Sequence, residues 1–454
     1  MIAATSARNF AERCGGQFIS GANTDVMLTG IAIDSRQVKP GDLFVAIQGE
    51  RVDGHDFVAS AADVGAVAAL VSKPVVHELP QILHGDIQSA VAEFGALSRE
   101  AFNGNVIGIT GSAGKTTAKN LIAAVLAEAG EVVATEGNQN NELGVPMTLA
   151  RLNPANEFAV IEMGAGKPGD IEWLQNIVRP SIGMLLNVTA AHLEHYPSID
   201  EIADTKSAIL AQLPKHGVAI FNGDEPWCDA WRARAGAARV ITFGFSDQVD
   251  VGVLDVTYDG FSGSYLKVRT PVGEWKLTLN IPGRQGVMNA LAAIAVAVAL
   301  GISHAAAARG LEKVRPAVGR GQQLLLAEDI TLVDDSYNAN PLSVKAAIDV
   351  LASCEGPRYL IFGAMLELGA DTPRFHAEIG RYAAEKGIDA LWIVGEIPRP
   401  ALGTFGSGGL AFASNEALLE KHPPIERGAT VLIKGSRGAR LDVLVEAIVI
   451  RMGV

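Results

Sequence analysis

The stretch that most constrains the fold runs from Val106 to Thr117 and reads Val-Ile-Gly-Ile-Thr-Gly-Ser-Ala-Gly-Lys-Thr-Thr. An apolar run with β character breaks into a glycine-rich turn, and a helical pattern follows from Ala118 to Ala129. Glycines let backbone N–H groups turn toward an anion, and the N-terminus of the following helix is electropositive. This order of strand, turn and helix predicts a phosphate-binding loop in an α/β protein.

Two side chains of this loop have the chemistry that a nucleotide needs. Lys115 is placed to reach the β- and γ-phosphates, and the Thr116 hydroxyl is placed to bind Mg²⁺. The match to the usual P-loop pattern is imperfect, because Ile109 stands five positions before Gly114 and the glycine is at 111. An ordinary strand–turn–helix with a surface lysine is the alternative. The order of the parts favours phosphate binding.

Length and charge limit the possible functions. A chain of 454 residues is long enough for about three domains. Its net charge of −13 leaves no basic surplus to neutralise phosphates, so we expect no nucleic-acid partner. The three cysteines, Cys14, Cys228 and Cys354, form no C-x-x-C pair. This spacing indicates neither a disulfide framework nor a zinc site and is typical of the reducing cytoplasm.

No segment predicts membrane insertion. Charged residues such as Arg8 and Arg13 interrupt any apolar stretch near the start, so we expect no signal peptide. The longest apolar run, from Ala290 to Leu300, is far shorter than the ~20 residues that span a bilayer. We expect this run to form a buried helix in a soluble, cytoplasmic protein.

The pattern of elements divides the chain into three predicted units, residues 1–82, 83–314 and 315–454. Strands and helices alternate in the second and third units, which predicts parallel sheets in an α/β fold. We expect a P-loop ATPase-like central domain and a Rossmann-like C-terminal domain. A G-x-G-x-x-G motif with an acidic residue at the dinucleotide spacing is absent from the sequence, so NAD binding is not supported.

Polar residues follow two predicted strands of the first unit. Ser35 and Arg36 come after the strand at 30–33, and a loop from Asp53 to Asp56 follows the strand at 43–47. Sheets of this class bind ligands beyond the carboxyl ends of their strands, so Arg36 is a candidate ligand contact. A solvated surface arginine is the alternative for Arg36.

Further candidates follow the strands of the second unit. Glu162 ends an apolar strand near the loop, the usual place of a Mg²⁺ ligand, although a structural role is also possible. Three asparagines, Asn138, Asn140 and Asn141, can present amides to a phosphate or to a metal-bound water, or can form Asx-turns. His192 can be a metal ligand, a general base or a structural residue, and Lys206 taken alone is a surface lysine.

Three further segments, 335–341, 363–369 and 434–437, follow predicted strands of the third unit. Taken together, these motifs resemble the Mur ligase family, and within it the MurF type, over essentially the whole chain. One departure is visible: family members often carry His-Asn where this chain has Gln285 and Gly286, which puts part of the adenine contact in doubt. The resemblance rests on 34–36, 53–57, 110–117, 138–146, 335–341, 363–369 and 434–437, with Glu162, His192, Lys206, Asn289 and Arg320.

The resemblance implies an ATP-dependent ligase that joins D-alanyl-D-alanine to UDP-N-acetylmuramoyl tripeptide through an acyl phosphate. It also implies two Mg²⁺ ions and a monomer. Because water would hydrolyse an acyl phosphate, we expect the third unit to close over the second after ATP binds. The implied ATP contacts are Gly111, Ser112, Ala113, Gly114, Lys115, Thr116, Thr117, Asn289, Arg320, Asp335 and Tyr337. The implied metal ligands are Thr116, Glu162, His192 and Lys206 as an N-carbamate, and the implied catalytic residues are Lys115, His192 and Lys206. The implied substrate contacts are Ser35, Arg36, Asp53, Gly54, His55 and Asp56 for the UDP end, Asn138 and Asn141, and the segments 363–369 and 434–437 for the dipeptide.

Three other functions remain open at this point. A sister ligase would add a different amino acid, and a P-loop phosphotransferase or motor ATPase would not require both peptides. A non-catalytic nucleotide sensor would leave Glu162, His192 and Lys206 without a task. The third residue of the tripeptide, diaminopimelate or lysine, also stays open.

Overall fold

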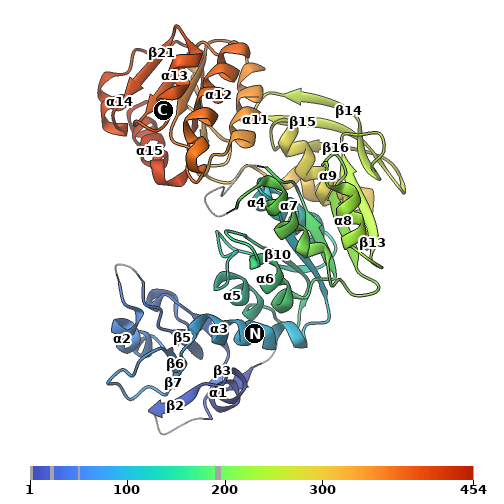
Figure 1. The fold of residues 1–454 in the computed structure, drawn as a ribbon, viewed down its shortest axis with the longest axis vertical. Coiled ribbons are helices and arrows are strands. Elements are labelled where there is room, and N and C mark those ends of the chain that lie inside the picture. Colours follow the sequence, from blue (N-terminus) through green and yellow to red (C-terminus); the bar gives the residue numbers. More distant parts are fainter. Residues whose placement is uncertain (1–3, 21–24, 50–51, 190–195, 453–454) are drawn as a thin grey trace.

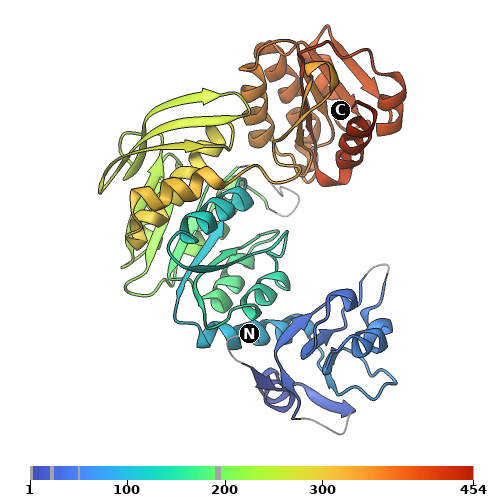
Figure 2. The same ribbon diagram turned by 180° about the vertical axis from the view of Figure 1, so that it is seen from behind.

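The computed structural model describes the chain except for residues 1–3, 21–24, 50–51, 190–195 and 453–454. Three α/β units follow one another along the chain and lie in a row, with the N-terminal and C-terminal units at opposite ends (Figures 1 and 2). The main sheet of each unit is mostly parallel. The predicted three-domain α/β fold is therefore confirmed, while the boundaries at 82/83 and 314/315 stay predictions.

The N-terminal unit has a five-stranded sheet and a short antiparallel pair. The strands are β1 (Thr5–Ser6), β2 (Gln17–Ser20), β3 (Met27–Leu28), β4 (Gly30–Ala32), β5 (Asp42–Val45), β6 (Ala68–Val71) and β7 (Gln81–Leu83), with helices α1 (Ala7–Cys14) and α2 (Val58–Asp63). The sheet order is β2-β7-β6-β5-β4, and β1 pairs with β3. Because β4 and β5 are parallel neighbours, the segments that follow them meet at one edge of the sheet.

Helix α3 (Ile87–Ala101) connects the first two units, and the sequence pattern did not predict it. Its Phe94 packs edge-on against Phe10, with ring centroids 5.2 Å apart, in the N-terminal core. On another face, a Cβ added to Gly95 would lie 2.6 Å from the Pro146 Cα of the central unit. The helix therefore contacts both units.

The central unit has a nine-stranded sheet in the order β16-β15-β14-β13-β12-β11-β8-β10-β9. Its strands are β8 (Asn105–Thr110), β9 (Glu131–Ala134), β10 (Asn156–Glu162), β11 (Ile182–Leu185), β12 (Val218–Asn222), β13 (Arg239–Gly244), β14 (Val251–Asp259), β15 (Gly263–Thr270) and β16 (Gly273–Leu279). Its helices are α4 (Lys115–Leu126), α5 (Gly144–Ala150), α6 (Asp170–Val178), α7 (Ile199–Ser207), α8 (Cys228–Arg234), α9 (Gly283–Leu300) and α10 (His304–Lys313).

The strand order places a ligand site at the end of β8. Strands β9 to β14 pair in parallel, whereas β14, β15 and β16 form an antiparallel extension. Both neighbours of β8, namely β10 and β11, come later in the chain, so the strand order reverses at β8. Sheets of this class bind ligands at such a switch point. Helix α4 begins at Lys115, three residues before the predicted start, so the lysine and both threonines belong to its first turn.

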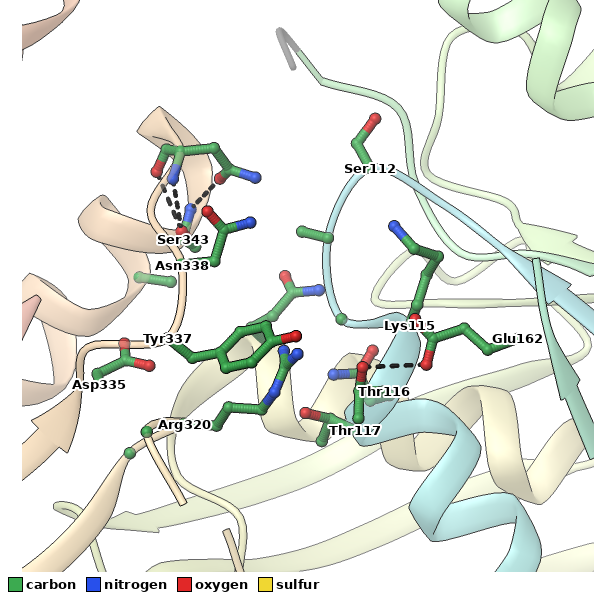
Figure 3. A pocket seen from close by; sticks show the side chains of 18 of the residues that line it. Ser112, Lys115, Thr116, Thr117, Glu162, Arg320, Asp335, Tyr337, Asn338 and Ser343 are labelled. Atoms are coloured by element: carbon green, nitrogen blue, oxygen red, sulfur yellow. Dashed lines mark hydrogen bonds between the residues drawn. The ribbon is translucent and has the colours of Figure 1, made fainter. Parts of the chain in front are cut away.

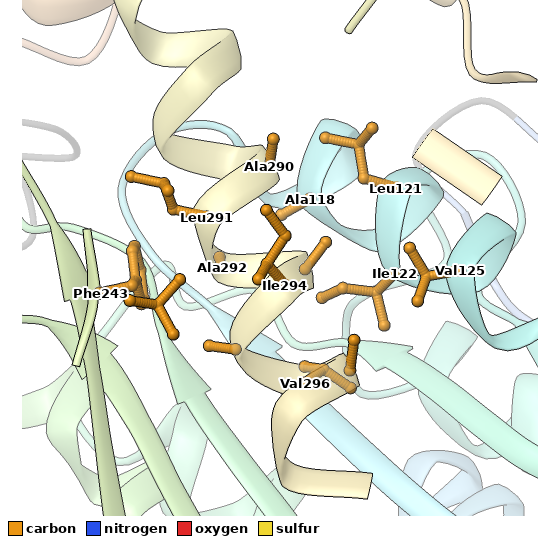
Figure 4. Close-up of a cluster of buried hydrophobic side chains, with 14 of the residues drawn as sticks. Ala118, Leu121, Ile122, Val125, Phe243, Ala290, Leu291, Ala292, Ile294 and Val296 are labelled. Atoms are coloured by element: carbon orange, nitrogen blue, oxygen red, sulfur yellow. The ribbon is translucent and has the colours of Figure 1, made fainter. Parts of the chain in front are cut away.

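Helix α9 forms the centre of the main core (Figure 4). Its alanines let it pack closely against Leu121 and Ile122 of α4 and against Phe243 of β13. By length and composition α9 is the one described helix that could cross a membrane, but 78% of that window is buried within the fold. The prediction of a buried helix here is therefore confirmed. A larger side chain at its alanines would overpack the core, at a cost of about 1–3 kcal/mol.

The C-terminal unit has a six-stranded sheet in the order β17-β18-β22-β19-β20-β21, parallel except for β17. Its strands are β17 (Gln322–Leu325), β18 (Thr331–Asp335), β19 (Arg358–Phe362), β20 (Ala390–Val394), β21 (Gly409–Phe412) and β22 (Thr430–Lys434). Its helices are α11 (Pro341–Ala352), α12 (Thr372–Glu385), α13 (Pro400–Phe405), α14 (Asn415–Lys421) and α15 (Leu441–Met452). This topology confirms the predicted Rossmann-like domain.

The central and C-terminal units touch at the tip of the β14–β15 hairpin, which reaches α11 (Figure 1). Phe261, at this tip, is 5% exposed and packs in the C-terminal core with Ala347 and Val350. Nearby, a Cβ added to Gly283 would lie 2.5 Å from a Val350 methyl group. These contacts hold the C-terminal unit beside the start of α9.

Candidate active site

The phosphate loop joins β8 to α4 at the carboxyl edge of the central sheet. Gly114 precedes α4 with φ +80°, a left-handed conformation that favours glycine. A Cβ there would also lie 2.6 Å from Asn289 Oδ1, so the position has no room for a side chain. Within the part of the chain that the structure describes, no side chain caps the N-terminus of α4. Its first N–H groups are therefore available to an anion.

Lys115 folds back over the loop. Its Nζ donates a hydrogen bond to the Gly111 carbonyl at 2.6 Å, and the ammonium lies beside the space that the loop encloses (Figure 3). Burial lowers the pKa of Lys115, although the nearby Glu162 carboxylate opposes this shift. A phosphate bound in the loop would supply the negative counter-charge for the Lys115 ammonium.

Asn187, two residues after β11, holds the loop in shape. The Ala113 N–H donates to Asn187 Oδ1 at 2.8 Å, and Asn187 Nδ2 donates to the Ala113 carbonyl at 3.0 Å. The backbone carbonyl of Asn187 accepts the Ser112 N–H at 3.0 Å. The prediction from sequence missed this residue. The available signal was an asparagine directly after a buried strand beside the loop.

Thr116 and Glu162 meet as the sequence predicted. Thr116 Oγ1 donates to Glu162 Oε2 at 3.0 Å, and Asn140 Nδ2 donates to Oε1 at 2.8 Å. Glu162 ends β10 and is buried, with 2% of its surface exposed. Asn140 is one of the three asparagines that the sequence offered as contacts to a phosphate or a metal-bound water, whereas only Asn138 and Asn141 were expected to contact the substrate. Both of these line the same cavity, although Asn141 Oδ1 also accepts the Gly144 N–H at 2.9 Å.

Lys206 lies on α7 and is 1% exposed. We find no hydrogen bond or ion pair between its ammonium and another described residue. Burial lowers the pKa of Lys206 well below its usual range, and the positive charge of Lys115 lowers it further. Its predicted partner, His192, lies outside the described residues. The structure therefore contradicts the surface location that the local sequence favoured for Lys206.

The C-terminal unit faces the loop from the other side of the cavity (Figure 3). The Arg320 guanidinium carbon lies 4.0 Å from the centre of the Tyr337 ring. Lys434, which is 2% exposed, donates to Asp335 Oδ2 at 2.6 Å and to the Asn338 carbonyl at 3.0 Å. Burial raises the pKa of Asp335, and the Lys434 ammonium opposes this shift.

Asp334 fixes the positions of Arg320 and Tyr337. Its Oδ2 accepts the Gly319 N–H at 3.1 Å, and its Oδ1 accepts the N–H and the hydroxyl of Ser336 at 3.1 and 2.6 Å. The Tyr337 N–H in turn donates to the Gly319 carbonyl at 3.0 Å. These bonds join the segment that carries Arg320 to the end of β18.

A cavity of about 740 Å³ separates the two sets of side chains. This volume lies within the range of small-molecule sites. Its lining includes nearly all the residues that the resemblance implied for ATP: Ser112, Ala113, Gly114, Lys115, Thr116, Thr117, Asn289, Arg320, Asp335 and Tyr337.

Two amide side chains of α9 line the same cavity. Asn289 Oδ1 and Gln285 Nε2 are buried and have no hydrogen-bond partner among the described residues. A Cβ on Gly286 would lie 2.7 Å from the Ile281 carbonyl, so the asparagine frequent there in the family would not fit without a shift. These unpartnered donor and acceptor atoms suit a polar ligand such as a nucleotide base.

The substrate residues predicted in the N-terminal unit meet at one edge of its sheet. Arg36 follows β4 in a 3-10 turn, where it pairs with Asp34 at 2.7 Å and its side chain is 86% exposed. Asp53 to Asp56 follow β5. A Cβ on Gly54 would lie 2.5 Å from the Ile47 nitrogen, so the turn requires glycine.

Both nitrogens of the His55 ring form hydrogen bonds within the N-terminal unit. The Ser72 N–H donates to Nε2 at 3.1 Å, so the proton lies on Nδ1 and is donated to Asp53 at 2.6 Å. Lys73 donates to the other oxygen of Asp53 at 2.6 Å and, with this bond, lowers the pKa of that carboxyl. His55 thus positions the turn, and its ring nitrogens are not available for a substrate in this arrangement.

Two further residues position the loop at 363–369. His376 Nε2 accepts the Met365 N–H at 2.9 Å, and its Nδ1–H donates to the Thr372 carbonyl at 2.7 Å. Burial lowers the pKa of His376, which keeps the ring neutral. Ser436 Oγ accepts the Leu366 N–H at 3.0 Å. No sequence motif pointed to a role for His376.

The donor set beside the loop fits Mg²⁺. Among the described residues no three His, Cys, Asp or Glu side chains gather as a metal site. Mg²⁺, however, prefers one or two carboxylates completed by waters and phosphates. The Glu162 carboxylate and the Thr116 hydroxyl, which already touch each other beside the phosphate loop, supply such oxygens.

The fold and this site define a class of protein: a nucleotide-dependent α/β enzyme with its reaction centre between two domains. Comparison with known proteins narrows the class. Three family models match, "Mur ligase family, catalytic domain" at 27–104, "Mur ligase middle domain" at 109–297, and "Mur ligase, glutamate ligase domain" at 319–437.

The UDP-N-acetylmuramoyl-tripeptide–D-alanyl-D-alanine ligase of Escherichia coli K12 is 38% identical, over 93% of this chain and 94% of that protein. The crystal structure of MurF from Acinetobacter baumannii superposes with a TM-score of 0.90 at 31% identity, over 98% and 99% of the two chains. MurF ligase from Thermotoga maritima, in complex with ADP, gives 0.82 at 27% identity, over 92% and 96%. The chain belongs to the Mur ligase family, which confirms the resemblance seen in the sequence.

Proposed function

We propose that this chain is the ATP-dependent ligase that joins D-alanyl-D-alanine to UDP-N-acetylmuramoyl tripeptide in peptidoglycan precursor synthesis. One observation carries the proposal: the loop from Ser112 to Thr117 and the residues Arg320, Asp335 and Tyr337 line one cavity between two domains. The family membership and the activity named for the E. coli relative support it.

The first step activates a carboxylate. The terminal carboxylate of the tripeptide attacks the γ-phosphorus of ATP, and ADP leaves with the bond electrons. Two anions must approach, so the loop N–H groups and the Lys115 ammonium serve to stabilise the charge that builds on the transferred phosphoryl group. Arg320, on the facing domain, adds a positive charge from the other side.

Thr116 and Glu162 are the residues that would hold one Mg²⁺ beside the loop. A bound Mg²⁺ neutralises phosphate charge and polarises the phosphoryl oxygens. Asn140, which donates to Glu162 Oε1, orients that carboxylate. His192 and Lys206 are the proposed ligands of a second ion.

The environment of Lys206 favours its conversion to a carbamate. A buried lysine without an anionic partner is held as the neutral amine, and only the neutral amine adds to carbon dioxide. The amine nitrogen bonds to the carbon of carbon dioxide as one C–O π bond opens, and the nitrogen loses a proton to water. The product is a carbamate anion with two oxygens, which would remove the repulsion with Lys115 and could bind a metal ion. Family resemblance and burial thus support the same assignment.

The second step forms the amide. The amine of D-alanyl-D-alanine attacks the carbonyl carbon of the acyl phosphate, and the tetrahedral intermediate expels inorganic phosphate. Water would destroy the acyl phosphate, so we expect the C-terminal domain to close over the central domain once ATP is bound. Residues 363–369 and 434–437 are the proposed receivers of the dipeptide.

The remaining substrate contacts are also proposals. Ser35, Arg36, Asp53, Gly54 and Asp56 lie at the sheet edge where the UDP end would bind, and His55 supports them from behind. Asn138 and Asn141 line the cavity where the peptide carboxylate would arrive. We further propose that the enzyme acts as a monomer in the cytoplasm, without nucleic-acid or membrane partners.

Phosphate release tests the function directly. The purified chain is assayed with Mg-ATP and each combination of UDP-N-acetylmuramoyl tripeptide and D-alanyl-D-alanine. Stoichiometric release of ADP and phosphate only when both peptides are present supports the ligase. Release that needs neither peptide would identify an ATPase, and release with a different acceptor amino acid would identify a sister ligase.

A further inference from the structure

A second cavity, of about 880 Å³, lies directly beside the nucleotide cavity. Residues of α4, the end of β9, the segment after α10 and the C-terminal unit line it. The two cavities share Thr116, Asn138, Arg320 and Tyr337 as lining residues. A molecule in the second cavity would therefore adjoin the bound nucleotide.

The lining of this second cavity is strongly cationic. Lys119, Arg151, Arg320 and Arg437 contribute four positive charges, against the one carboxylate of Glu136. Glu136 is already paired with Arg151. In a chain with a net charge of −13, such a local excess of positive charge is unexpected from composition.

The three other cations find no carboxylate partner among the described residues. Lys119 is 5% exposed, and its ammonium donates at 2.6 Å to the Thr135 carbonyl, a neutral acceptor. The guanidinium carbons of Arg320 and Arg437 lie 4.0 and 5.5 Å from the centre of the Tyr337 ring. The Tyr337 ring thus lies beside the positive charges of Arg320 and Arg437, which come from different parts of the chain.

An anion bound in the second cavity would reduce the electrostatic repulsion among these positive charges. Guanidinium groups bind carboxylates through paired, charge-assisted hydrogen bonds. The Tyr337 N–H, which donates to the Gly319 carbonyl, and the Asp334 side chain, which accepts the Gly319 N–H, fix the ring on which Arg320 stacks. The nucleotide phosphates have their own cradle in the phosphate loop. The UDP diphosphate has its proposed place in the N-terminal unit. The remaining anionic groups of the two proposed substrates are the carboxylates of the peptides.

We propose that the second cavity is a carboxylate-binding subsite for a peptide substrate, with Arg437 and Arg320 as its cationic groups. This inference rests on the proposed ligase function. The carboxylate has two possible sources: the C-terminus of D-alanyl-D-alanine, or the side chain of diaminopimelate as third residue of the tripeptide. Lysine at that third position would supply no such group.

The test is Arg437→Ala, assayed with matched substrates. D-alanyl-D-alanine is compared with its C-terminal amide, and the diaminopimelate tripeptide with the lysine tripeptide. We expect the variant to raise KM about 10- to 100-fold for one carboxylate-bearing substrate and to leave KM for its counterpart without the carboxylate unchanged. The substrate affected identifies the source, and Arg437→Lys should restore part of the loss.

Arg381→Ala is the control, because Arg381 is exposed on α12 and lines neither cavity. A higher KM for ATP with both peptides unaffected would overturn the proposal, as would equal effects on the matched substrates or no effect at all. Wild-type amide formation is measured first. Its absence would refute the ligase function itself, whereas an active wild type with an unresponsive Arg437→Ala would refute only the subsite.

Discussion

Replacing Asn187 with alanine should loosen the phosphate loop without touching a ligand-binding side chain. The substitution removes two hydrogen bonds to Ala113, at 2.8 and 3.0 Å, and leaves that residue's N–H and carbonyl unsatisfied. At about 1 kcal/mol or more for each group, the free energy of unfolding should fall by about 2–4 kcal/mol. Nucleotide binding must then also order the loop, which costs about 2 kcal/mol or about 30-fold in affinity.

The assay is ADP binding by calorimetry, together with thermal unfolding of the same samples. Asn222→Ala is the matched control: Asn222 is 5% exposed, ends the neighbouring strand β12, and bonds to Asp224 rather than to the loop. The control should lose stability but keep its ADP affinity. A folded Asn187→Ala with wild-type affinity, or an equal loss of affinity in the control, would refute the reasoning.

Four further substitutions test other parts of the site. Glu162→Ala should lower kcat at least about 100-fold and raise the Mg²⁺ concentration needed, because Thr116 loses its carboxylate partner; titration of activity with Mg²⁺ checks this. Lys206→Ala should abolish activity, and added short carboxylic acids should restore part of it; an active variant without them would count against a carbamate. Lys434→Met should lower the free energy of unfolding by at most about 3–5 kcal/mol, because it leaves the partly buried Asp335 carboxylate without its ion-pair partner; denaturant titration measures the loss. Burial raises the pKa of Glu225 to about 7, so the folded state binds more protons than the unfolded state between about pH 4.5 and 7, and stability falls as pH rises through this window. Glu225→Gln should therefore be more stable than wild type at pH 8, by at most about 3 kcal/mol, and no more stable at pH 4.

The reaction centre could be predicted where its chemistry follows local sequence order. Lys115 and Thr116 occupy fixed places after a strand and a glycine turn, and Glu162 ends the neighbouring strand. The structure brings Thr116 and Glu162 within 3.0 Å. Lys206 came only from family resemblance, because a lysine on a polar helical stretch has no local sign of burial.

The residues that position the centre were beyond sequence reasoning. Asn187 lies 74 positions from Ala113, and His376 contacts Met365 only because a helix turns back over the loop. In the sequence, a polar residue at a strand end gives the same signal whether it caps its own turn or bonds to a distant loop. His55 shows the reverse case, since a predicted substrate residue proves to be bound by its own neighbours.

The central claim is that a peptide carboxylate is phosphorylated before the amide forms. In that reaction one oxygen of the tripeptide carboxylate leaves with the phosphate. With the carboxylate labelled with oxygen-18, mass spectrometry of the released phosphate should find one labelled oxygen in each phosphate formed. Unlabelled phosphate, released at the rate of amide formation, would contradict an acyl phosphate and the role assigned to the loop around Lys115.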